Sequence, residues 1–72
     1  MAKIKLYNVA KRYLEIIELM EKTHEPQDLA HLEEQRVIWH NKLMAALRRQ
    51  GIPFKDREHV TRLAIHIVRG TE

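Results

Sequence analysis

Apolar positions along the chain recur at the spacing of α-helices, and they predict three helices joined by two short connections. The first predicted helix covers about residues 9–22, where apolar residues recur every three or four positions and charged residues occupy the other side. The second covers about residues 26–50. The third covers about residues 57–69, with apolar residues at i, i+3, i+4, i+7 and i+8 from Val60 to Val68. We therefore expect an all-α fold, a small three-helix domain built on an antiparallel helical hairpin with a long central helix.

Residues with special backbone preferences mark the ends of the predicted helices. Pro26 suits the first position of a helix, because its missing N–H would have no partner there. Gly51 and Gly70 are expected to end the second and third helices, since glycine adopts the left-handed conformation cheaply. Asp56 is a good N-cap for the third helix. The link at residues 23–25 is short, so the first two helices should be antiparallel neighbours.

Residues 1–7 are ambiguous. Alternation from Lys3 to Leu6 is typical of a strand, but a lone strand needs a partner and no second convincing strand exists. Residues 2–7 are therefore an extended N-terminal arm, a strand added across a dimer, or an early start of the first helix. Asn8 is a candidate cap for a helix that starts at Val9. The β-branched residues 64–68 also allow a strand, although the cap and the spacing favour a helix.

The length and composition predict one small domain over residues 1–72. A chain this short buries only about 60% of its unfolded surface, and oligomerisation is a common remedy for the resulting low stability. Cysteine is absent, which excludes disulfides and thiolate metal sites and fits a cytoplasmic location. No apolar run approaches the roughly 18 residues of a membrane span, and the N-terminus lacks a signal-peptide pattern.

The apolar side of the second helix is unusually wide, about half of its circumference, which indicates packing against more than one neighbour. Glu33, Arg36 and His40 interrupt this apolar side. A charged group there must be paired or hydrated, and Glu33 and Arg36 are spaced to pair along the helix. Three interpretations remain open: a satisfied polar layer inside the fold, a polar layer that sets the register of a homodimer, or a ligand site.

A self-associating module would use the second helix for contact. Tryptophan with arginine is typical of binding hot spots, although it is equally typical of a small core. The partner in this hypothesis is a second copy or another protein. Its predicted contact residues are Glu33, Arg36, Trp39, His40, Leu43 and Met44.

The uneven charge supports an alternative function. Residues 42–70 carry seven basic and two acidic side chains, whereas residues 23–41 carry one basic and four acidic side chains. Such asymmetry attracts anionic partners or lets two copies associate head to tail. A basic surface would bind nucleic acid through phosphates, but the last helix has no Asn or Gln to recognise adenine. The candidate residues are Arg48, Arg49, Lys55, Arg57, Arg62, His66 and Arg69.

Signatures of enzymes and of cofactor sites are absent from the sequence. There is no glycine-rich phosphate loop, nucleophile motif or cysteine nucleophile. Glu21 and His24 have the spacing found in di-iron bundles, but those sites need a second such motif and further carboxylates. We therefore expect a non-enzymatic interaction or regulatory module without metal, cofactor or small-molecule substrate, and a nucleic-acid-binding regulator is the alternative.

Overall fold

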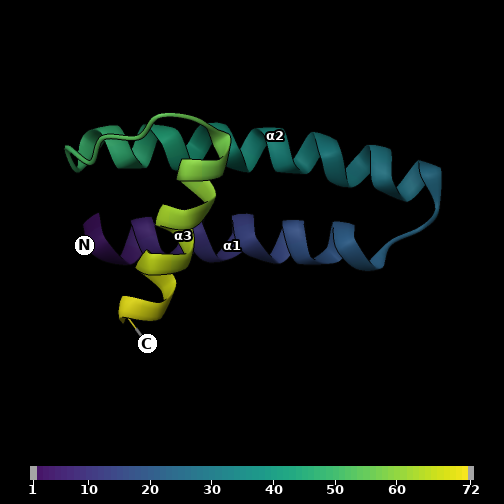
Figure 1. Ribbon diagram of the computed structural model, residues 1–72, viewed down its shortest axis with the longest axis horizontal. Coiled ribbons are helices and arrows are strands. Elements are labelled where there is room, and N and C mark those ends of the chain that lie inside the picture. Colours follow the sequence, from purple (N-terminus) through teal and green to yellow (C-terminus); the bar gives the residue numbers. More distant parts are fainter. Residues whose placement is uncertain (1, 72) are drawn as a thin grey trace.

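The computed structural model describes residues 2–71 of the chain, and the side chains of residues 5–70, as three α-helices (Figure 1). Helix α1 spans Ala2–Lys22, α2 spans Pro26–Arg49 and α3 spans Arg57–Thr71. Residues 2–71 contain no strand, so the predicted all-α fold is confirmed and the strand alternative for residues 64–68 is wrong.

Helices α1 and α2 lie side by side, and α3 crosses them near the end that holds the N-terminus (Figure 1). Their contacts are consistent with the expected antiparallel hairpin. Helix α3 follows α2 in the chain but packs mainly against α1. The molecule is elongated, 37 × 23 × 19 Å, and the link at residues 23–25 lies at the end far from α3. Helix α3 therefore covers only one half of the hairpin.

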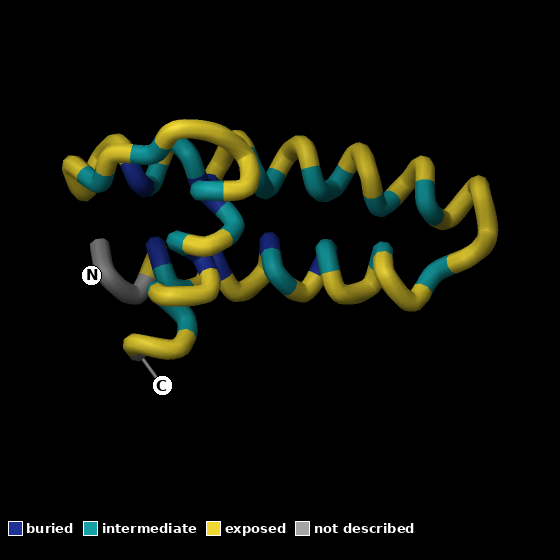
Figure 2. The backbone as a smooth tube through the Cα atoms, viewed as in Figure 1, coloured by how far each residue is buried: buried dark blue, intermediate teal, exposed yellow. Residues whose placement is uncertain are grey.

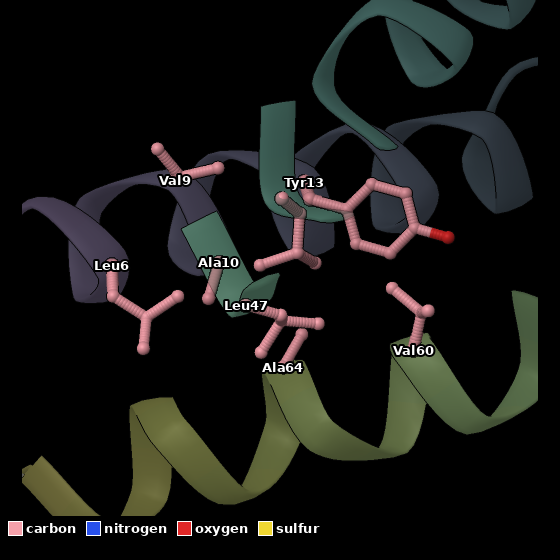
Figure 3. Packing of buried hydrophobic residues seen from close by; sticks show 8 residues of the cluster. Leu6, Val9, Ala10, Tyr13, Leu47, Val60 and Ala64 are labelled. Carbon is pink, nitrogen blue, oxygen red and sulfur yellow. The ribbon is translucent and has the colours of Figure 1, made fainter. Parts of the chain in front are cut away.

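The other half, which we call the open half, consists of residues 17–37. None of these residues is buried, whereas buried residues occur on both sides of this range in the sequence (Figure 2). A cluster of fully buried side chains lies where α3 crosses the hairpin. It includes Tyr13, Leu43, Leu47 and Val60, and the small residues Ala10 and Ala64 lie between α1 and α3 (Figure 3).

Three of the four predicted signals at the helix ends are confirmed, and one is wrong. Pro26 begins α2, and Gly51 follows it with a left-handed φ of 70°, as expected. Asp56 caps α3, because its Oδ1 accepts a hydrogen bond from the His59 N–H at 2.9 Å. The predicted stop at Gly70 is wrong, since α3 continues to Thr71. Glycine tolerates helical backbone angles at an entropic cost, and no proline follows it to forbid them.

The start of α1 differs from the prediction. Helix α1 begins at Ala2 instead of residue 9, so the extended arm is wrong, and Asn8 lies inside the helix instead of capping it. The reason is tertiary burial: Leu6, Val9 and Tyr13 are buried in the core at helical spacing. This burial outweighs the strand-like alternation of residues 3–6. Met1 lies outside the described residues.

Candidate interaction site on the open half of the hairpin

A groove of about 720 Å³ lies where the N-terminal part of α3 meets the open half. Tyr13, Ile17 and Met20 of α1 form its apolar part. Its polar lining comes from all three helices and includes Glu21 of α1, Glu33 and Arg36 of α2, and Arg57, Thr61 and Arg62 of α3. The groove thus joins two residues predicted for partner contact with two predicted for nucleic-acid binding, although these pairs are more than 20 positions apart in the sequence.

Arg36 and Glu33 form the ion pair that their spacing predicts. The guanidinium donates to both carboxylate oxygens, and the Nε–Oε2 distance is 3.0 Å. The Arg36 side chain is only 12% exposed, whereas that of Glu33 is 48% exposed. The hydrogen bonds lower the pKa of Glu33 and raise the pKa of Arg36. Both groups stay charged near neutral pH, and the two-point contact fixes the orientation of Arg36.

A hydroxyl chain joins α1 to α3 beside the groove. Thr61 donates its hydroxyl hydrogen to the Arg57 carbonyl oxygen at 3.0 Å. Because Thr61 has only one such hydrogen, the Tyr13 hydroxyl is the donor in its 3.1 Å hydrogen bond to Thr61 Oγ1. Tyr13 is fully buried, so this bond satisfies its polar atom and fixes one wall of the groove.

His40 lies behind the groove, against the ring of Tyr13. The two ring centroids are 5.7 Å apart, with 44° between the ring planes. The Nε2 atom of His40 is buried and has no hydrogen-bond partner among the described residues. Burial lowers the pKa of His40, and the positive charges of Arg36 and Arg57 lower it further. The imidazole is therefore neutral at pH 7.

The other predicted contact residues of α2 do not share a surface with the groove. Leu43 is fully buried in the core of the single chain, which leaves it no area for a partner. Trp39 and Met44 are partly buried and pack against the same core. The Lys42 ammonium group lies 4.3 Å from the centroid of the Trp39 ring.

The structure brings only some of the basic residues predicted for nucleic-acid binding together: Arg57 and Arg62 line the groove, and Lys55 and Arg62 line a smaller depression. Arg62 is paired with Glu58 at 2.7 Å, and Arg48 lies 5.5 Å from the centroid of the Phe54 ring. Arg57 borders the groove. The remaining members of the set are exposed: Arg49, Lys55, His66 and Arg69.

Three exposed apolar residues of the hairpin were not among the predicted contact residues. Leu19 is 47% exposed, Val37 is 43% exposed and Ile38 is 45% exposed. Val37 and Ile38 also line a second depression of about 360 Å³ with Glu33 and Glu34. Adjacent apolar residues point to different sides of a helix, so this pair was a signal that at least one is exposed.

Charge is strongly separated between the open half and the rest of the chain. The open half has a formal charge of −4, because it contains six carboxylates and only two basic side chains, Lys22 and Arg36. All other residues together carry +7, which gives the net charge of +3. The carboxylates of the open half are Glu18, Glu21, Glu25, Asp28, Glu33 and Glu34.

The described residues hold no group of three or more histidine or carboxylate side chains arranged to bind a metal ion. Within residues 2–71, no helix has both the length and the apolar character that crossing a membrane requires. Comparisons of the chain with protein-family models, curated proteins and solved structures found no match.

Proposed function

We propose that this protein is a small, non-enzymatic interaction module that self-associates by burying the open half of its hairpin. The observation that carries the proposal is the position of α3, which covers one half of the hairpin and leaves the groove uncovered. The groove exposes apolar area of Ile17 and Met20 beside charged side chains, a combination that is typical of interaction sites.

The small core of the single chain gives self-association a stabilising role. A domain of about 70 residues without a disulfide or metal has little apolar area to bury, so its stability is marginal. Association would bury Ile17 and Met20 in the groove and would cover Val37 beside Glu33. Each buried methylene group contributes about 0.8 kcal/mol.

Arg36 and Glu33 serve to fix the register of such an interface. Apolar surfaces are tolerant of sliding, whereas a polar pair in one position makes most alternative registers leave charges unpaired. The pair is already formed in the single chain, so a partner would meet a preorganised arrangement.

Light scattering coupled to size exclusion, over a range of protein concentrations, tests this proposal. We expect the mass to approach twice the 8.6 kDa of the chain as the concentration rises. Val37→Lys places a charge in the open half and should raise the dissociation constant about tenfold or more. Ala45→Lys, at an exposed position of α2 outside the open half, is the matched control. A wild-type chain that stays monomeric at millimolar concentration would contradict self-association.

Nucleic-acid binding is a second candidate, supported by the charge of +7 outside the open half. The exposed residues Arg49 and Lys55 suit phosphate contact. Binding to duplex DNA should then weaken with salt by about one log unit of affinity per log unit of salt for each neutralised phosphate. Arg49→Glu with Lys55→Glu should lower this slope. Affinity that equals that of a scrambled basic peptide would dismiss the candidate.

A further inference from the structure

We propose that two copies dock antiparallel, so that the outer face of α3 in each copy lies on the open half of the other. This inference rests on the proposed self-association and specifies its geometry. Three observations carry it: the outer face of α3, the composition of the open half, and the position of α3 on the hairpin.

The outer face of α3 combines positive charge with one exposed apolar residue. Val60 and Ala64 are fully buried and define the inner side of the helix. Arg62 and Arg69 lie on the opposite side, and Ile65 is exposed between them in the sequence. The Arg62 side chain also borders the groove of its own chain. Glu58 pairs with Arg62 on this face, so Arg69 carries its uncompensated charge.

The open half presents the complementary surface. Ile17 and Met20 provide apolar area in the groove, and Glu21 lies in the groove beside them. The groove itself is charge-balanced, because its three carboxylates are matched by three arginines. The attraction for the basic face of α3 therefore comes from the open half as a whole, whose formal charge is −4. Ile65 of that copy would then contact apolar side chains, while Arg62 and Arg69 contact carboxylates.

A two-fold axis allows both contacts to form at once. Because α3 occupies one half of its own hairpin and leaves the other half open, an antiparallel second copy places each α3 on the opposite open half (Figure 1). The assembly is then closed, with the same surface used twice. The alternative with the two open halves together would place two charges of −4 side by side, which is repulsive.

A charge-swap experiment tests the antiparallel geometry. The hairpin variant carries Glu21→Lys and Glu25→Lys, and the helix variant carries Arg62→Glu and Arg69→Glu. When each variant is measured alone, the dissociation constant of its homodimer should rise about tenfold or more, because like charges then meet at both contacts. In an equimolar mixture, both contacts pair opposite charges again. We expect a heterodimer with nearly wild-type affinity, identified by native mass spectrometry with one chain isotopically labelled.

The controls separate this inference from the proposed function. Lys5→Glu changes charge at an exposed site outside both surfaces and should leave dimerisation unchanged. Circular dichroism checks that each variant is folded. If Val37→Lys dissociates the dimer but the mixed variants form no heterodimer, self-association stands and the antiparallel geometry is overturned. A hairpin variant that dimerises more tightly than wild type also overturns it. A monomeric wild-type chain overturns both proposals.

Discussion

At the scale of single residues, His40 is a titratable side chain whose surroundings disfavour its protonated form. Its Nε2 atom is buried without a hydrogen-bond partner, and Arg36 and Arg57 contribute positive charge nearby. Protonation would place a further positive charge in this environment. The folded state therefore favours the neutral imidazole, whereas the unfolded chain protonates His40 at its ordinary pKa of about 6.5.

We predict that His40 makes stability depend on pH below about 6.5. The folded pKa is lowered, so the unfolded state binds more protons, and the free energy of unfolding falls as pH drops below about 6.5. Glu33 also has a lowered pKa, but its contribution is lost only below about 4.5. Urea denaturation at several pH values should show a shallower pH dependence for His40→Leu. Equal slopes in the two proteins would refute this role.

The two glycines should respond to alanine in opposite ways. Gly51 has a φ of 70°, so Gly51→Ala should cost roughly 1–2 kcal/mol although its Cβ would meet no neighbour. Gly70 lies in the last turn of α3, where an added Cβ also has space. Gly70→Ala should raise stability by up to about 0.5–1 kcal/mol, because it reduces the freedom of the unfolded chain. Denaturation midpoints that move in the same direction would contradict this difference.

At the scale of elements, the sequence predicts a helix best where a local chemical signal and the apolar spacing agree. Pro26 and Asp56 act through their own backbone or side chain, so their helices begin where expected. The start of α1 depends on long-range burial of Leu6, which the alternation of its neighbours concealed. At Gly70 the local signal was misleading, because a glycine often ends a helix but does not force it to end, and α3 continues to Thr71.

The cap of α3 is the element-scale interaction that a single substitution tests most directly. Asp56→Ala removes the acceptor of the His59 N–H and should cost about 1 kcal/mol, measured by chemical denaturation. Asp56→Asn keeps an oxygen acceptor in the same place and should retain most of the stability. An equal loss in both variants would mean that the negative charge, and not the hydrogen bond, supplies the stabilisation.

At the scale of the whole molecule, the groove lies beyond what periodicity can predict. Apolar spacing identifies which face of each helix is buried, but it does not say which half of the hairpin α3 covers. That choice brings Arg57 toward Glu33 and removes Leu43 from the surface. The wide apolar side of α2 has a related cause, since Ile52 and Phe54 of the following connection pack on the same core.

Because α3 covers only one half of the hairpin, local unfolding should occur more easily in some segments of the chain than in others. Amide protons in residues 9–16 and 43–47 belong to segments that contain the core, so their exchange with solvent should require global unfolding. Amides in residues 19–22 and 29–32 should exchange much faster through local opening, which mass spectrometry or NMR measures directly. Equal exchange rates along the hairpin would contradict this gradient. The segment that opens most easily is also the proposed contact surface, so its amide exchange should slow as the protein concentration rises.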